Sequence, residues 1–229
     1  MNILRWIGIG FGGLLSVIVL ALVGVLTYGQ TSFRPLLKDR PLYEVQADTS
    51  PEGIARGEYL IGSVMGCNGA CHTPENGAAL SGTVEYIQDG PISATFAVPN
   101  LTSHETGLGS WTDAEIARAI REGVDREGRV MVVMPSFNYH VMSDADVAAV
   151  VGYLRSLEPV ENEIPPFDAN LVAKAMLALG LMGPNVRLEP ITAPQEAPQP
   201  GTVAYGGYLA SLAACRDCHG ICLLYTSDA

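Results

Sequence analysis

Basic residues are scarce in this sequence: 13 lysines and arginines stand against 24 aspartates and glutamates, for a formal net charge of −11. Proteins that bind nucleic acid normally present a basic surface to the phosphates. An acidic surface is compatible with steering a positively charged partner protein, and equally with a surface that only keeps the chain soluble. The charge balance therefore argues against a nucleic-acid partner.

Charge is absent altogether from one stretch near the N-terminus, the 23 residues from Trp6 to Tyr28. As a helix, this stretch is long enough to cross a bilayer core of about 30 Å. A cleaved signal peptide is the alternative, because Arg5 precedes the run, but the run is long for one and no A-x-A-like site follows. We therefore expect residues 1–30 to be a single-pass anchor and residues 31–48 a linker.

The basic residues beside this span do not decide its orientation. Arg5 precedes it, whereas Arg34, Lys38 and Arg40 follow it. The positive-inside rule alone would mildly favour a cytoplasmic location for the rest of the chain. The chemistry of the cysteines gives a better criterion.

Cysteine and histidine are also scarce, with five and four residues, yet most of them lie in two clusters. Cys215, Cys218 and His219 form a complete C-x-x-C-H, the motif of covalent haem attachment. Two thiols on one turn can each add to a vinyl group of haem, and the adjacent histidine is then held beneath the iron as an axial ligand. The spacing predicts a bound haem c.

The other cluster has one residue more, since Cys67, Cys71 and His72 read C-x-x-x-C-H. We expect Gly69 to let this loop bulge outward and keep both sulfurs at the haem edge. A disulfide or half of a zinc site are the alternatives. Zinc needs a fourth ligand that neither cluster offers, and a disulfide leaves the paired histidines unexplained. Haem is therefore favoured here too.

A short repeat precedes each cluster. Residues 55–60 read A-R-G-E-Y-L and residues 204–209 read A-Y-G-G-Y-L, so both follow A-x-G-x-Y-L. Such self-similarity indicates a duplicated structural unit. We expect two haem domains, each beginning with a helix that leads into its haem loop.

Local signals predict three helices in the first domain. The first begins at residues 49–51 and runs to Val64, since proline is favoured at the first helical position. Residues 112–115 form a capping box that opens a second helix, which Gly123 ends. Residues 143–146 resemble another capping box, and an apolar stripe follows. Three helices around one haem predict an all-α fold.

The iron above His72 needs a sixth ligand. Methionine is the usual choice in electron-transfer cytochromes, because its thioether raises the redox potential. Met134 is the preferred candidate: it precedes Pro135 in a loop between predicted helices, far enough from His72 for the chain to encircle the haem.

Four other residues are alternative iron ligands. Met131 and Met142 are expected to be packing residues, since methionine commonly fills gaps in cores. His104 and His140 would give a bis-histidine site, but loop or turn positions are favoured for both. Met134 thus remains the prediction.

The order of these motifs resembles bacterial membrane-bound class I cytochromes c, including the cytochrome subunits of periplasmic alcohol and sugar-acid dehydrogenases. R-G-E-Y-L, G-C-N-G-A-C-H-T-P, P-N-L-T-S-H-E-T-G-L-G-S-W and M-P-S-F-N-Y-H carry the resemblance. It spans about Ser50 to Pro166 and departs from the family pattern in the extra residue between Cys67 and Cys71. It implies a cytochrome c domain at residues 49–166.

The resemblance also implies surroundings, location and partners. Asn100, Leu101, Gly109 and Trp111 would lie against the haem, with ordinary loop and core packing as the alternative. Because bacteria attach haem c outside the cytoplasm, the globular part would lie in the periplasm. The electron source would be a dehydrogenase or quinol, and the acceptor a cytochrome or oxidase.

A different composition follows the first domain. Residues 167–200 comprise an apolar run at 171–183 and a proline-rich stretch at 184–200. The run is too short to cross a bilayer; we prefer packing against the first domain over a position in the membrane interface. Residues 201–221 are expected to begin a second cytochrome domain.

The last residues, 222–229, resemble a one-frame translation of a transposase-end sequencing adapter. We expect them not to be natural protein, so that Cys222 has no role. The second domain would then be cut after its proximal histidine and before any methionine ligand.

The leading functional prediction is an electron carrier that transforms no substrate. A haem enzyme such as a dihaem peroxidase is the second, because one iron could keep its sixth position open. A structural module held by zinc or disulfides is the third.

Overall fold

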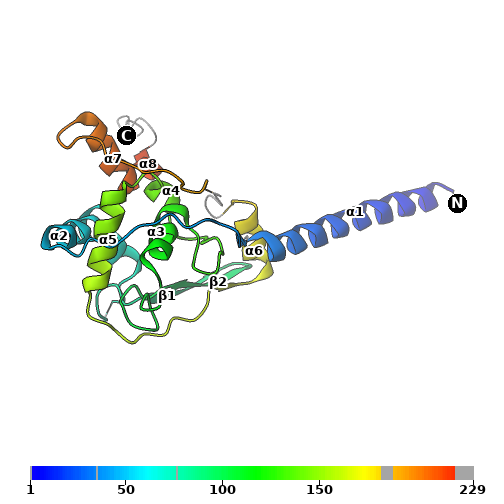
Figure 1. Ribbon diagram of the computed structural model, residues 1–229. Coiled ribbons are helices and arrows are strands. Elements are labelled where there is room, and N and C mark those ends of the chain that lie inside the picture. The colour runs from blue at the N-terminus through cyan, green and yellow to red at the C-terminus, as the bar shows by residue number, and fades with distance from the viewer. Residues whose placement is uncertain (1, 35, 76, 182–187, 220–229) are drawn as a thin grey trace.

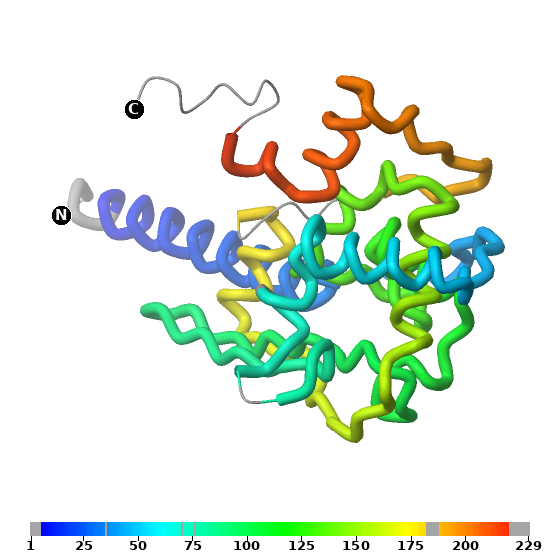
Figure 2. The backbone as a smooth tube through the Cα atoms, turned by 90° about the vertical axis from the view of Figure 1, so that its left-hand side faces the viewer, coloured from blue at the N-terminus to red at the C-terminus, as the bar shows by residue number. Residues whose placement is uncertain are grey.

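The computed structural model describes residues 2–34, 36–75, 77–181 and 188–219. Helix α1 (Asn2–Ser32) projects away from all other elements, which gather at its C-terminal end (Figures 1 and 2). Residues 222–229, the predicted adapter-derived tail, lie outside the described residues. The arrangement separates an apolar rod from a folded body.

The rod is apolar on all sides. Within Trp6–Ser32, the most apolar 18-residue window has a mean hydropathy of 2.6, and no residue of that window is buried against the rest of the protein. A helix that exposes large apolar side chains around its whole circumference is typical of a membrane span. The chain therefore has one N-terminal helix apolar enough to span a membrane.

The first and third predicted helices are present and begin where their capping residues indicate. They are α2 (Pro51–Tyr59) and α5 (Asp144–Ser156). The side chains of Ser50 and Ser143 each accept a hydrogen bond from a backbone N–H in the first turn, which satisfies a donor that the helix leaves unpaired. The predicted helix starts are confirmed.

Helices α2 and α5 cross with their backbones in contact. A Cβ atom on Gly57 would clash with the carbonyl oxygen of Ala149, so no larger residue fits. The crossing buries the apolar stripe of α5, which consists of Val147, Val150, Val151 and Leu154. After the crossing the first helix continues as a π-helical turn, η1 (Leu60–Val64), as far as predicted.

The second predicted helix is α3 (Asp113–Glu122). Thr112 and Glu115 each bond the other's backbone N–H, so the predicted capping box is confirmed. Gly123 ends the helix with a φ of 65°, a left-handed conformation that glycine adopts without steric cost. A short helix, α4 (Ser136–Tyr139), follows.

A small sheet accompanies the helices. Strands β1 (Thr83–Asp89) and β2 (Ile92–Val98) form an antiparallel hairpin, and β3 (Asp168–Ala169) adds to β2 in the order β1-β2-β3. Gly90 makes the turn with a φ of 51°. The fold is therefore a helical body with a three-stranded sheet, and the all-α expectation is wrong in this part. Strand pairing, which helical periodicity does not report, decides this region.

The apolar run after the first domain forms α6 (Leu171–Ala178). It lies against both the C-terminal end of α1 and the sheet (Figure 1). The predicted packing against the first domain is present, and α1 is a second packing partner of this helix. Residues 182 and 183 of the predicted run lie outside the described residues.

The proline-rich linker lies on the body. The backbone N–H of Ile191 donates to a carboxylate oxygen of Glu122 at 3.1 Å, and the N–H of Asp144 donates to the carbonyl of Gln195 at 2.9 Å. Arg40 pairs with Glu122 at 2.5 Å from the other side. The linker therefore runs over α3 and the start of α5.

The chain then forms α7 (Val203–Leu212) and α8 (Cys215–His219), which pack beside α4 (Figure 2). Side chains of α7 belong to the same apolar core as the first domain. The fully or largely buried members of this core are Val45, Leu60, Ile61, Met65, Leu80, Leu108, Ile116, Ala117, Ile120, Tyr139, Met142, Val147, Val150, Val151, Leu154, Tyr208 and Leu212.

Candidate haem-binding site

The first cysteine cluster forms a π-helical turn, η2 (Cys67–Cys71). The backbone N–H of His72 donates to the carbonyl oxygen of Cys67 at 3.0 Å, an i→i+5 bond. Such a turn holds one residue more than an α-helical turn. The extra residue of C-x-x-x-C-H is therefore absorbed within the helix, and both cysteines stay on the same turn.

The backbone freedom expected of Gly69 is found at Gly66 instead. Gly66, just before the first cysteine, has a φ of 68°, whereas Gly69 is not among the glycines with positive φ. A left-handed residue at this point turns the chain sharply from η1 into the haem loop. The expected bulge at Gly69 is replaced by the bend at Gly66 and the wider turn.

The two thiols of this loop differ in environment. Cys67 packs against the apolar core, whereas Cys71 is exposed. Burial raises the pKa of Cys67 to about 12, because a thiolate is poorly solvated there. All four described cysteines carry free thiols, so the disulfide alternative is not realised in the part of the chain that the structure describes.

His72 is buried and oriented by a single backbone group. Its Nδ1 lies 2.9 Å from the carbonyl oxygen of Pro99, which can only accept, so Nδ1 carries the proton. Burial lowers the pKa of His72, which keeps the ring neutral. The lone pair is then on Nε2, the form in which imidazole binds a metal. Sequence reasoning missed Pro99, since a backbone acceptor leaves no signal in residue types.

The loop that presents the Pro99 carbonyl is held by Asn100, which is almost fully buried. Its amide nitrogen donates to the carbonyl of Val160 at 2.8 Å. Its oxygen accepts from the backbone N–H of Thr102 at 2.9 Å and from the hydroxyl at 2.8 Å. Asn100 therefore fixes the segment that orients His72, and direct contact with haem stays a prediction.

Leu101 and Trp111 are half-buried and pack against the apolar core. Arg155 donates to the carbonyl oxygen of Trp111 at 2.5 Å. Gly109 is required for packing of the loop, because a Cβ there would lie 2.7 Å from the carbonyl oxygen of Ser103. Their predicted contact with haem is not tested by these positions.

Met134 lies in the loop before α4 and packs, half-buried, against the same apolar core as Cys67. Met142 is fully buried in that core, in agreement with a packing role. His104 and His140 already have Nδ1 partners, the hydroxyl of Thr106 and the carbonyl of Arg121, each at 2.9 Å. Met134 remains the predicted sixth ligand.

The second cluster forms α8 rather than a π-helical turn. Ala214, just before Cys215, has a φ of 54°, so this loop also begins with a left-handed residue. The side-chain nitrogen of Asn138 in α4 donates to the carboxylate of Asp217 at 2.8 Å. This bond ties the second cysteine loop to the first domain.

Helix α7 is tied to the first domain by a buried polar network. Arg56 bonds both carboxylate oxygens of Asp146, at 2.8 and 3.0 Å, and also donates to the hydroxyl of Tyr205 at 2.9 Å. The hydroxyl of Tyr208 donates to Asp146 at 2.6 Å and accepts from the N–H of Ser143 at 3.1 Å. Sequence reasoning missed this network, which joins α2, α5 and α7.

Tyr139 lies between the two cysteine loops. Its hydroxyl donates to the carbonyl oxygen of Met65 at 3.2 Å. Burial raises its pKa, and the nearby Cys67, Cys71 and Asp217 raise it further. Helix α4 therefore contacts both loops, which brings the two predicted haem sites to one side of the body.

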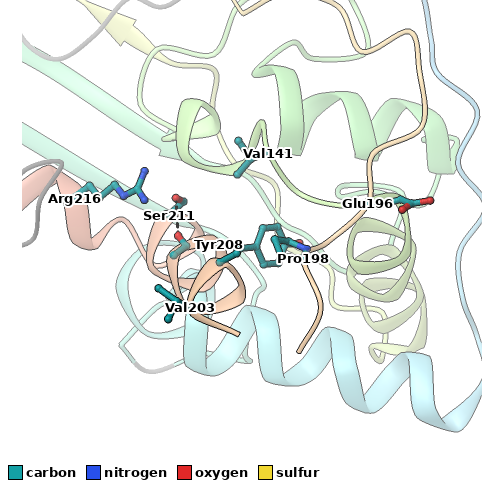
Figure 3. Close-up of a pocket in the computed structure, with 9 residues that line it drawn as sticks. Val141, Glu196, Pro198, Val203, Tyr208, Ser211 and Arg216 are labelled. Atoms are coloured by element: carbon teal, nitrogen blue, oxygen red, sulfur yellow. Dashed lines mark hydrogen bonds between the residues drawn. The ribbon is translucent and has the colours of Figure 1, made fainter. Parts of the chain in front are cut away.

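A cavity of about 530 Å³ lies between α7 and the linker (Figure 3). Its walls include Val141, Glu196, Tyr208 and Arg216, with Glu196 and Arg216 on opposite sides of Tyr208 in this view. Of the described cysteines and histidines, none lines this cavity. It belongs to the junction of linker and α7, apart from the first haem loop.

The donor set of the first loop fits haem c. Two thiols lie on one turn, a neutral buried imidazole follows with Nδ1 occupied, and a methionine packs against the same core. Residues 52–154, which contain all of them, match the family model described as cytochrome c oxidase, cbb3-type, subunit III. This segment is a cytochrome c domain, whose cofactor is haem c.

Relatives specify the class further. The chain is 33% identical over 150 residues to the cytochrome c subunit of quinone alcohol dehydrogenase from Gluconacetobacter polyoxogenes (60% of this chain, 30% of the relative). It is 30% identical over 176 residues to the gluconate 2-dehydrogenase cytochrome c subunit from Pantoea cypripedii (72% and 37%). It is 30% identical over 131 residues to a dihaem cytochrome c from Cereibacter sphaeroides (55% and 42%). The chain is thus similar to dehydrogenase cytochrome subunits and spans less than half of each relative.

Proposed function

We propose that this chain carries single electrons through covalently bound haem c at the periplasmic face of the membrane. The observation that carries the proposal is the first haem loop, where two cysteines share a turn and the next residue is a buried imidazole held by the Pro99 carbonyl. Haem c supplies an iron that cycles between Fe(II) and Fe(III).

Each residue of the loop has a separate role in this proposal. Cys67 and Cys71 would form the thioether links, and Nε2 of His72 and the sulfur of Met134 would bind the iron. The apolar side chains around Cys67 and Met134 exclude water, which favours the less charged reduced form.

We further propose that residues 201–221 begin a second cytochrome c domain, with Cys215 and Cys218 as attachment sites and His219 as ligand. The repeat before each cluster supports this. A similar protein named as a dihaem cytochrome c also supports it.

The proposed electron donor is a dehydrogenase subunit or quinol, and the acceptor a cytochrome or an oxidase. Relatives named as dehydrogenase cytochrome subunits support a dehydrogenase partner. The same relatives do not favour the dihaem peroxidase alternative. Anchoring by α1 would keep the haem domain next to membrane-bound partners.

Met134→Ala, with Met131→Ala as the matched control, tests the iron ligands. The Met134 variant should lose the near-infrared iron–sulfur absorption, shift to a lower redox potential and bind carbon monoxide when reduced. Met131→Ala should change none of these. Unchanged potential and absorption in Met134→Ala would exclude this methionine, and rapid carbon monoxide binding by the unaltered first haem would contradict the carrier.

A further inference from the structure

Helix α6 packs against α1 at Gly29, where the uncharged stretch Trp6–Tyr28 ends. Gly29, directly after Tyr28, is buried, and a Cβ there would lie 2.5 Å from the Cα of Ala175. The two helix backbones therefore touch, as they do where small residues meet at helix crossings. Figures 1 and 2 both show α6 beside the C-terminal end of α1.

Aromatic and charged contacts hold the same junction. The rings of Phe33 and Phe167 lie 6.1 Å apart, and the ammonium of Lys174 lies 5.3 Å above the Phe33 ring. Lys174 also pairs with Asp168 at 3.6 Å. These contacts tie the anchor to the chain that enters α6, so the anchor is not a free tether.

The other side of α6 is fixed to the sheet. Asn170 caps the helix, and its side-chain nitrogen donates to the carbonyl oxygen of Pro91 in the hairpin turn at 2.8 Å. Ala173 is fully buried beside Ala94 of β2. Helix α6 therefore connects the anchor to the haem domain as one packed unit.

Large apolar side chains nevertheless remain uncovered on and after α6. Leu179 is 51% and Leu181 66% exposed, and Leu171 at the other end of the helix is half exposed. Lys174 is the one charged residue of α6, and its contacts turn it toward Phe33 and Asp168. Uncovered leucines beside the end of a membrane span are placed to enter the boundary between headgroups and acyl chains.

We infer that α6, with Leu179 and Leu181, lies in the membrane interface and binds the boundary between lipid headgroups and acyl chains. The occupant is lipid because α6 packs on the end of the apolar helix α1, where Gly29 touches Ala175 and Tyr28 is 50% exposed. The inference rests on the proposed anchoring by α1. Its consequence is that the haem domain has a fixed orientation to the membrane.

The test uses the full chain with Cys215→Ala, Cys218→Ala and Cys222→Ser, loaded with haem at the first loop, in lipid nanodiscs of one copy each. Single cysteines are introduced as Leu179→Cys and Leu181→Cys, and their reaction rates with a membrane-impermeant maleimide are measured. Val203→Cys, at a site 95% exposed on α7, is the water reference, and Val17→Cys is the bilayer reference. Positions 179 and 181 should react at least ten-fold more slowly than position 203.

Each other outcome has a defined meaning. Rapid reaction at 179 and 181 with protection at 17 would overturn the interfacial position while leaving the anchor intact. Rapid reaction at 17 would overturn the anchor itself. Protection that appears in multi-copy vesicles but not in single-copy nanodiscs would show that a second chain, and not lipid, covers α6.

A packing variant tests the link to the anchor. Ala175→Leu should separate α6 from Gly29 and raise the reaction rate of the cysteine at 179 at least several-fold, with the haem absorption unchanged. Ala178→Leu, on the same helix but partly exposed, is the matched control and should leave the rate unchanged. Equal rates in both variants would contradict the Gly29–Ala175 contact as the basis of the position.

Discussion

The two helices that lead into the cysteine loops share the A-x-G-x-Y-L motif but use opposite faces of it. In α2, Gly57 touches the carbonyl of Ala149 in α5, while Tyr59 is 46% exposed. In α7, a Cβ added to Gly206 would have no atom of the described residues within 4 Å, while Tyr208 is 6% exposed. The same motif therefore serves the crossing of α2 with α5 in one case and the packing of α7 against α4 and α5 in the other.

The motif alone therefore does not fix the role of either face. In α2 the glycine face is crossed by α5, whereas in α7 no described residue lies against the face of Gly206. The tyrosine is free to take a role from its surroundings, and in α7 its hydroxyl reaches Asp146 and Ser143 of the first domain. The docking of α7 places the second cysteine loop beside α4, and so beside the first loop.

The largest expected difference in unfolding free energy is between substitutions of Gly57 and Gly206. Gly57→Leu should drive a side chain into the backbone of α5 and destabilise the holoprotein by about 3 kcal/mol or more. Gly206→Leu should not destabilise this chain and should stabilise it by up to about 1 kcal/mol, because its face is open and leucine is the better helix former. Chemical unfolding in detergent, followed by haem absorption, measures both, and equal losses would contradict the comparison.

The next largest difference in unfolding free energy is expected between substitutions of Tyr208 and Tyr59. Tyr208→Phe removes a hydroxyl that bonds a buried carboxylate and a buried N–H, and should cost about 1–3 kcal/mol. Tyr59→Phe is the matched control and should be nearly neutral, because the Tyr59 side chain is half exposed. If the two variants have the same unfolding free energy, α7 does not dock through Tyr208.

Smaller changes in stability are expected from substitutions of the residues that precede the two cysteine loops. Gly66 and Ala214 both have left-handed backbones, with φ of 68° and 54°. Gly66→Ala should cost about 1 kcal/mol, while Ala214→Gly should relieve strain and stabilise by a similar amount. Gly69→Ala should have little effect, since its φ is not positive. Opposite signs for Gly66→Ala and Ala214→Gly in the unfolding free energy are the expected result.

A weaker effect is expected from the pH dependence of the docked tyrosine. Burial, with the bond to Asp146, raises the pKa of Tyr208 to about 12, above the value of about 10 for an unfolded chain. The folded state thus favours the protonated phenol. Its stabilising contribution is complete below pH 10 and is lost as the pH rises toward 12.

The difference between the unaltered protein and Tyr208→Phe isolates this contribution from those of the other tyrosines. The difference in unfolding free energy should be constant below pH 10 and shrink above it. A difference that grows with pH would mean that the phenolate, and not the phenol, is favoured by the docked state.

Much of the helical frame could be predicted, because its signals are local. Ser50, the capping box of Thr112 and Glu115, and Ser143 mark helix starts through bonds that span three residues. The hairpin at residues 83–98 was missed although an Asp-Gly pair lies at its turn, a signal for hairpins when flanked by strand-forming residues. That signal could have corrected the all-α prediction.

Other features depend on contacts that the sequence does not display. Whether the first loop closes as an i→i+4 or an i→i+5 turn is decided by how the chain must pass from Gly66 to His72. The Pro99 carbonyl and the Asp146 carboxylate acquire their roles from segments far away in sequence. Residue types predicted the cysteines and histidine of the candidate site, but not the groups that orient them.

The sharpest test of covalent haem attachment at the first loop is acid-acetone extraction and the pyridine haemochrome spectrum of three purified proteins. Haem should stay with the unaltered chain and with Cys215→Ala/Cys218→Ala, and the spectrum should be that of thioether-linked haem. In Cys67→Ala/Cys71→Ala, haem linked to the first loop should be lost. If haem is extracted from the Cys215→Ala/Cys218→Ala protein, or none is bound, residues 67–72 do not attach haem c.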